Sequence, residues 1–133
     1  MIKAEDLRIG DLVNFHNSPC IITGIDDISC TVGLLNSYNS EDFRRVDDIN
    51  IEPIPLTPEI LEKNGWKKRT EGWYFMMISK YMYLSVEFGY ENGIRVFLKR
   101  TTDGLYVKLN IANNVHELQH ILWALGKDAN LKI

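Results

Sequence analysis

The chemical signature that stands out in the chain is the pentapeptide HELQH at residues 116–120. It fits the pattern H-E-x-x-H, in which two histidines on one helix face bind zinc and the glutamate activates a metal-bound water. Such a site needs a third protein ligand. In the extended pattern the glycine and the third histidine would fall at Trp123 and Gly126, and the residues after His120 offer only Asp128 as a carboxylate.

The surroundings of HELQH favour a structural role instead. Asn114 and Glu117 have the N-cap and N3 spacing of a capping box, so a helix that begins here accounts for the glutamate. His116 and His120 fall at the polar margin of that helix. Its apolar stripe is formed by Leu118, Ile121, Leu122 and Leu125. We therefore predict helix-surface or helix-margin histidines, no metal site and no cofactor, and keep a zinc hydrolase as an unfavoured alternative.

A second set of residues suits binding rather than catalysis. Residues 73–79, 81–89, 94–100 and 105–111 are rich in aromatic and β-branched side chains, which predicts four strands. Alternation gives these strands a core face with Met82, Leu84, Val86, Phe88, Ile94, Val96, Leu98, Leu105, Val107 and Leu109. The opposite, outer face would hold Tyr81, Tyr83, Ser85, Glu87, Arg95, Phe97, Lys99, Tyr106 and Lys108.

The outer face leaves three interpretations open. Aromatic rings between Arg and Lys on an open antiparallel sheet offer a stacking surface to single-stranded nucleic acid. The same composition suits a protein interface, either within the chain or with a second copy. It also occurs on plain solvated faces, where Tyr and paired charges are common.

A basic cluster, Trp66, Lys67, Lys68 and Arg69, follows the first predicted helix. Cations beside an aromatic ring could contact phosphates. Alternatively, Trp66 anchors the helix exit in the core and the basic side chains are solvated. The acidic pairs of the chain have no calcium-loop spacing, and no nucleophile-elbow, P-loop or dinucleotide-binding glycine motif occurs.

The elements that position these residues are readable in the second part of the chain. Thr57 and Pro58 begin a short helix that Gly65 ends. The Asn-Gly at 92–93 and the Asp-Gly at 103–104 are hairpin signals, so the four strands should form an antiparallel meander. A closing helix that ends at Gly126 completes an α-β-β-β-β-α order, with one face of the sheet covered by helix.

The first part reads as five short strands within about 55 residues. We expect turns at 17–19 and at Asp26-Asp27, a polar loop over 36–42, and a last extended segment over 51–55. A run of strands this small closes into a barrel because open edges are costly, which predicts an SH3-like barrel.

Composition bounds the remaining possibilities. The chain has 133 residues, 45% hydrophobic and 25% charged, as in ordinary globular domains. No transmembrane run of 18 apolar residues occurs and the first residues do not resemble a signal peptide, so we expect a cytoplasmic protein. Residues 1–56 carry four Lys or Arg against ten acids, and residues 57–133 carry eleven against eight, so charges of −6 and +3 give the net −3.

The two cysteines, Cys20 and Cys30, do not form a C-x-x-C pair. A two-residue turn at Asp26-Asp27 would place Cys20 near Gly33 and Cys30 near Thr23, so the thiols would not face each other. We predict buried, reduced thiols.

Three stretches carry a family resemblance: EDLRIGDLVNF (5–15), IEPIPLTPEILEKNGWKK (51–68) and VHELQHILWALGKDANL (115–131). The chain resembles a family of uncharacterised small proteins from phages and mobile elements of gut anaerobic bacteria. Its members share an I-x-P-I-P-L-T linker and a C-terminal V-H-x-L-Q-x-L-x-x-A-L-x-G helix. The resemblance implies a phage or mobile-element origin and carries over no activity and no functional residue.

The sequence thus predicts an α+β protein, with an SH3-like β-barrel over 1–56 and an α+β domain over 57–133. We expect no enzyme but a binding module for protein or a small ligand, acting at the seam of the two parts or on the outer sheet face. A single-stranded nucleic-acid binder is the alternative, and a homodimer is left open. The binding candidates are Tyr81, Tyr83, Arg95, Phe97, Lys99, Tyr106, Lys108, Trp66, Lys67 and Lys68.

Overall fold

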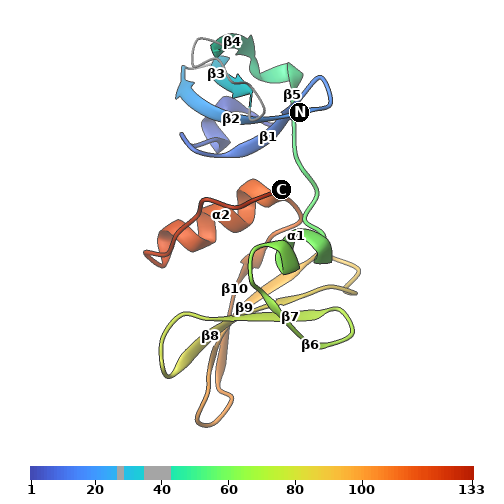
Figure 1. Ribbon diagram of the computed structural model, residues 1–133, viewed down its shortest axis with the longest axis vertical. Coiled ribbons are helices and arrows are strands. Elements are labelled where there is room, and N and C mark those ends of the chain that lie inside the picture. Colours follow the sequence, from blue (N-terminus) through green and yellow to red (C-terminus); the bar gives the residue numbers. More distant parts are fainter. Residues whose placement is uncertain (27–28, 35–42) are drawn as a thin grey trace. The chain divides into compact units, whose positions relative to one another are not determined.

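The computed structural model describes residues 1–26, 29–34 and 43–133. Its fold is mixed α+β, with two antiparallel sheets of five strands each and two α-helices (Figure 1). The chain divides into two compact units. The first comprises Met1–Ile54 with Asn114–His116, and the second comprises Pro55–Asn113 with Glu117–Ile133.

The first unit contains a five-stranded sheet, as the sequence predicts. Its strands run in the order β4-β3-β2-β1-β5, so the last strand returns to pair with the first and the sheet forms a half-barrel. Two 3-10 helices, η1 (Ala4–Asp6) and η2 (Asp48–Asn50), flank the strands. The strand bounds are β1 (Leu12–Phe15), β2 (Ser18–Ile25), β3 (Ser29–Leu34), β4 (Phe43–Asp47) and β5 (Ile51–Glu52).

Alternating apolar residues of these strands form the core of the first unit. Val13, Ile22, Val32 and Ile51 have no exposed surface, and they pack in one cluster with Ile2, Leu7, Cys20 and Cys30. Asp11 is also fully buried, and its Oδ2 accepts the backbone N–H of Arg8 at 2.8 Å. This bond supports the turn that leads into β1.

The turn between β1 and β2 lies one residue earlier than predicted. His16 and Asn17 adopt positive φ values of 50° and 62°, and Phe15 pairs with Ser18, which describes a two-residue hairpin turn. Ser18 and Pro19 therefore belong to β2. The expected turn at 17–19 was wrong because a residue pair with positive φ turns the chain before the proline is reached.

The predicted cysteine register was also wrong. Cys20 pairs with Leu34, and Cys30 pairs with Ile25, because β2 carries an irregularity between Ile22 and Gly24 and the turn is closed by Asp26 N–H to the Ser29 carbonyl at 2.8 Å. The two thiols are free and buried, as predicted. Asp27 and the polar loop at 36–42 lie outside the described residues.

The second unit contains a continuous meander in the order β10-β9-β8-β7-β6. Four strands were predicted, and the fifth is β6, at Lys67–Thr70. The sequence of β6 does not alternate and all four of its residues are exposed, so the expected pattern of a half-buried strand is missing. The other strands are β7 (Trp73–Met77), β8 (Met82–Glu87), β9 (Arg95–Arg100) and β10 (Tyr106–Ile111).

Two helices lie on the same side of this sheet (Figure 1). In α1 (Pro58–Lys63) the Thr57 hydroxyl accepts the N–H of Ile60, and Gly65 at φ 85° allows Trp66 N–H to reach the Leu61 carbonyl. The other helix, α2 (Val115–Ala124), ends in the same way at Gly126. The predicted helix limits are confirmed. The buried residues of this unit include Leu61, Trp66, Tyr74, Leu84, Val86, Val96, Leu118 and Leu122.

The predicted burial of the core face of the second sheet is confirmed only in part. Leu84, Val86 and Val96 have no exposed surface, but Leu105 and Val107 are 63% and 61% exposed. Leu105 precedes β10 and Val107 lies within it, and β10 is an edge strand with a neighbour on one side only, so these residues lack the cover of a central strand. Within the part of the chain that the structure describes, no helix is long and apolar enough to cross a membrane.

Candidate ligand-binding face of the second sheet

The face of the second sheet opposite Tyr74 and Leu84 collects aromatic and cationic side chains from all five strands. Strand register sets Phe75 opposite Ser85, Ser85 opposite Phe97, and Phe97 opposite Lys108. Tyr74 points the other way and donates its hydroxyl to Glu62 of α1 at 3.4 Å. The outer face is therefore the side away from α1. Its members include Lys67, Arg69, Trp73, Phe75, Met77, Tyr83, Ser85, Glu87, Arg95, Phe97, Lys99, Tyr106 and Lys108.

A buried ion pair lies within the outer face. Lys99 Nζ donates to Glu87 Oε2 at 2.7 Å, and the side chains are 15% and 3% exposed. The Ser85 hydroxyl donates to the same oxygen at 2.7 Å, and the Tyr90 hydroxyl donates to Oε1 at 3.2 Å. Glu87 thus receives three hydrogen bonds, which offsets the cost of burying its charge.

The cations around Glu87 are also held by aromatic rings. The Arg95 guanidinium lies 3.9 Å from the centroid of the Tyr90 ring, and Lys99 Nζ lies 5.1 Å from that of Trp73. Burial, and then the hydrogen bond to Glu87, raise the pKa of the Tyr90 hydroxyl. Arg95 and Lys99 are therefore committed to the sheet rather than available to an incoming ligand.

Three other cations of the outer face are exposed. Lys67 and Arg69 lie on β6, and Lys108 lies on β10. In the described part of the chain none of the three forms an ion pair. With Arg95 and Lys99 they give the outer face five cations against the single acid Glu87.

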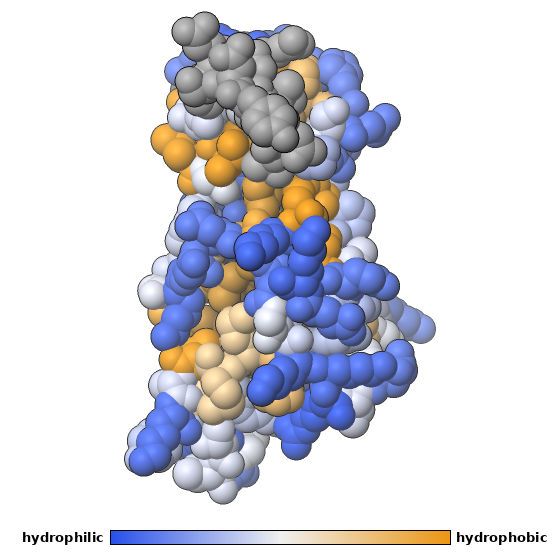
Figure 2. Space-filling view, in the orientation of Figure 1, coloured by the Kyte–Doolittle hydropathy of each residue, from blue (hydrophilic) through white to orange (hydrophobic). Residues whose placement is uncertain are grey.

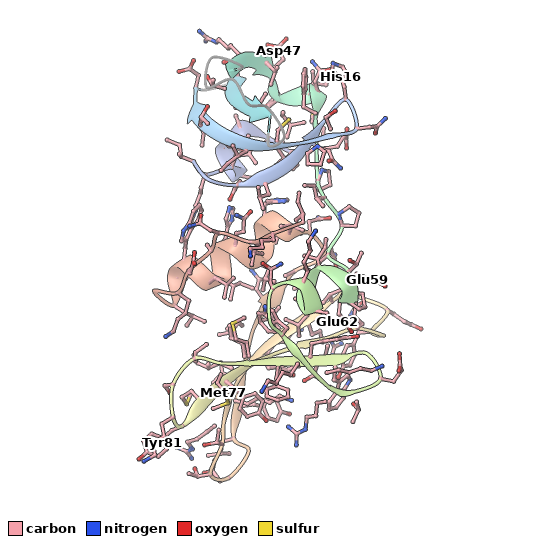
Figure 3. The ribbon with its side chains drawn as sticks, viewed as in Figure 1. His16, Asp47, Glu59, Glu62, Met77 and Tyr81 are labelled. Carbon is pink, nitrogen blue, oxygen red and sulfur yellow. The ribbon has the colours of Figure 1, made fainter. Side chains whose placement is uncertain are left out.

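The outer face also contains a hollow of about 370 Å³. Arg69, Phe75, Met77, Tyr83 and Thr101 line it, so one cation and two aromatic rings surround the same space. Arg69 Nη1 donates to the Tyr83 hydroxyl at 2.9 Å, and the Tyr83 and Phe75 rings pack edge-to-face at 6.0 Å. These contacts hold the walls of the hollow in place without filling it. Figure 3 labels Met77 on its strand.

Two aromatic rings on the outer face are open to solvent. Tyr106 is 64% exposed and Trp73 is 37% exposed. Tyr106 packs edge-to-face on Phe97, which is only 8% exposed, with ring centroids 5.5 Å apart. A planar ligand group could therefore stack on Tyr106 or Trp73 while the rings beneath stay fixed. Figure 2 shows hydrophilic side chains over much of the visible surface of the second unit, with apolar atoms between them.

The structure brings six of the ten predicted binding residues onto the strands of the outer face: Tyr83, Arg95, Phe97, Lys99, Tyr106 and Lys108. Lys67 joins them because it pairs with Phe75. Lys68 pairs with Tyr74 on the helix side and forms an ion pair with Glu71 at 2.7 Å.

The last two of the ten candidates, Trp66 and Tyr81, do not lie on the strands of the outer face. Trp66 is 3% exposed, so it belongs to the core and anchors the end of α1, as the alternative interpretation of this residue predicted. Tyr81 precedes β8 at the tip of the β7–β8 connection, is 56% exposed, and has Lys80 Nζ 5.5 Å from its ring (Figure 3).

Sequence reasoning missed several residues of this face. Trp73, Phe75 and Met77 come from β7, and Thr101 follows β9, whereas Arg69 of β6 was already part of the basic cluster at 66–69. The alternation of Trp73, Phe75 and Met77 was a usable signal, since it places them together opposite Tyr74. The cations of β6 were marked by their basic run, but nothing in that run indicated a strand of this sheet.

The HELQH histidines have different environments. The prediction was for histidines at the helix surface or at its margin. His116 is 7% exposed and therefore buried, whereas His120 is half-buried and stacks on Trp123 with ring centroids 6.0 Å apart. Among the residues that the structure describes, no group of three or more His, Cys, Asp or Glu is placed to hold a metal ion.

Comparisons with protein-family models, with curated proteins and with solved structures found no match for the chain.

Proposed function

We propose that the protein is a non-enzymatic binding module and that the outer face of the second sheet takes single-stranded nucleic acid. The observation that carries the proposal is the joint presence of exposed aromatic rings and exposed cations without ion-pair partners on one open sheet. Tyr106 and Trp73 offer stacking surfaces, and Lys67, Arg69 and Lys108 offer contacts to phosphates.

The hollow supports the same ligand class. Stacking on Phe75 and Tyr83 suits any base, since every base has a π-face, and Arg69 at the rim suits a phosphate or a base edge. A base in the hollow would lie on the same face as Tyr106. The ligand would thus be recognised mainly by stacking and charge, with little sequence preference.

A protein or a small ligand is the other class of occupant for this face. The exposed Met77, at 50%, and Tyr106 would suit an apolar partner as well. Three exposed cations with a single, already neutralised acid favour the anionic ligand. Binding of a neutral peptide with no salt dependence would support the other class.

The first unit fits an SH3-like barrel, which we propose as its finer fold. The strand order β4-β3-β2-β1-β5 and the 3-10 helix η2 immediately before β5 support the assignment. We also propose a phage or mobile-element origin, on the sequence resemblance alone, and a cytoplasmic location. The proposed origin and location do not affect the binding proposed for the outer face.

Fluorescence anisotropy with a labelled single-stranded oligonucleotide tests the function. We expect binding whose affinity falls with salt, with a log–log slope of about −2, because three cations each contribute about 0.7 on a single strand. Tyr106→Ala should weaken binding by about 1–3 kcal/mol, the worth of one stacked base. Leu105→Ala, a neighbour of equal exposure on the opposite face, should leave it unchanged.

A second pair of variants separates charge from stacking. Lys108→Gln should reduce the magnitude of the log–log salt slope by about 0.7, which is the contribution of one phosphate contact. Lys127→Gln, which removes an exposed charge after α2, is the matched control and should leave the slope as it is. Absence of binding at low salt, or binding that Tyr106→Ala does not weaken, would refute the proposal.

A further inference from the structure

The two edges of the second sheet differ in how they are protected. At one edge, β6 consists of Lys67, Lys68, Arg69 and Thr70, and such charged edge strands resist pairing with other chains. At the other edge, Leu105, Tyr106 and Val107 are 63%, 64% and 61% exposed in succession. An exposed apolar edge of this kind is a template for another strand.

The pairing of β10 with β9 determines which residues of β10 direct their backbone N–H and C=O groups toward the sheet and which direct them outward. Leu105 accepts Arg100 N–H at 2.9 Å, and Val107 lies opposite Leu98 in the same register. Alternate residues of an antiparallel strand direct both backbone groups to the same neighbour. The carbonyl of Leu105 and both backbone groups of Val107 therefore face β9, while the Leu105 N–H donates to Asp103 Oδ1 within the turn. Tyr106 and Lys108 direct their N–H and C=O groups away from β9.

We propose that β10 pairs antiparallel with β10 of a second copy of this chain, about a twofold axis at Val107. Tyr106 then lies opposite Lys108 of the partner subunit, and each such pair exchanges two backbone hydrogen bonds. Val107 lies opposite the partner's Val107, and Leu105 lies opposite the partner's Leu109. The outward backbone groups of Tyr106 and Lys108 are the ones that this register uses.

The side chains support a second copy as the occupant because the register is self-complementary. Each Lys108 cation meets the aromatic ring of the partner's Tyr106 rather than another lysine, and the apolar residues meet each other. Opposite residues in an antiparallel pair project on the same face, so the outer faces of the two copies would join. This pairing requires no nucleic acid, although it uses the Tyr106 and Lys108 side chains that the proposed ligand would also contact.

Sedimentation velocity of the ligand-free protein tests the inference. A six-residue strand interface is small, so we expect a weak dimer that forms as the protein concentration is raised from about 1 to about 500 µM. Val107→Lys should abolish dimerisation, because it places like charges face to face at the axis. Val107→Glu should do the same, and an equimolar mixture of the two variants should restore a dimer.

A matched variant and a stability measurement distinguish loss of the dimer from loss of the fold. Ile49→Lys introduces a lysine at an exposed apolar residue of the first unit, which is 62% exposed, and this variant should dimerise like the parent chain. Thermal unfolding should show all variants folded, since Val107 contributes little buried surface. A parent chain that stays monomeric over the whole range, a Val107→Lys dimer, or a mixture that stays monomeric would overturn the inference.

Discussion

Lys99 Nζ lies 2.7 Å from Glu87 Oε2 on the outer face of the second sheet, where Glu87 is almost fully buried. The pair is unusual for a sheet face because both charges are withdrawn from solvent by the side chains around them. It joins β8 to β9 and sets the position of Tyr90, and through Trp73 it reaches β7. These contacts order the outer face, on which the proposed ligand would lie.

Removing Glu87 should be costly. In Glu87→Ala, Lys99 keeps a buried charge without its partner, and we expect the free energy of unfolding to fall by about 3–5 kcal/mol. The double variant Glu87→Gln with Lys99→Met removes both buried charges, keeps a carbonyl acceptor for one of the two hydroxyls of Ser85 and Tyr90, offers the other an amide N–H, and should recover most of the loss. Urea denaturation measures both. Glu71→Ala, which breaks the exposed pair with Lys68, should have little effect.

Both cysteines should be unreactive in the folded protein. Cys20 and Cys30 are 0% and 1% exposed, and burial raises the pKa of both thiols, so little thiolate forms near neutral pH. A chromogenic thiol reagent should label neither at pH 7 and should label both after unfolding in urea. Rapid labelling of native protein would contradict the burial of these strands.

Gly93→Ala should destabilise the connection between β8 and β9. Gly93 has φ 116°, and an added Cβ would collide with the side chain of Asn113, whose Oδ1 accepts the N–H of Ile94 at 2.9 Å. We expect a loss of about 1–3 kcal/mol in the free energy of unfolding. Gly104→Ala is the matched control, because at φ 71° its Cβ meets nothing within 4 Å. Equal losses for the two variants would argue against the Asn113 contact.

The β9–β10 hairpin should weaken in acid. Hydrogen bonds from Arg100 and from the Leu105 N–H hold the pKa of Asp103 below its usual value. A lowered folded-state pKa stabilises the fold above the unfolded-state value near 4, and this contribution is lost as pH falls through the folded-state pKa. The difference in thermal midpoint between the parent chain and Asp103→Asn should therefore be constant near pH 7 and shrink below about pH 4. A difference that does not change with pH would rule out the ion pair as its source.

The helix limits and the order of most strands could be predicted from the sequence, because they depend on residues that are close together in the chain. Thr57, Gly65 and Gly126 marked helix limits through capping chemistry, which depends on neighbours within one turn. The meander of β7 to β10 followed from alternation and from turn residues at Gly93 and Gly104. The position of β6 was missed, because an exposed, charged edge strand lacks the periodicity that marks a buried face.

The sequence by itself determined which elements form and which side chains share a strand face, since alternation and capping are local properties of the chain. Only the tertiary structure decided which of those faces are covered. Whether Trp66 is buried, whether Val107 is exposed, and whether Glu87 meets Lys99 depend on strand register and on which strands form the edges of the sheet. Those are contacts between residues distant in sequence, and their free energy is set by burial and by the number of neighbouring strands.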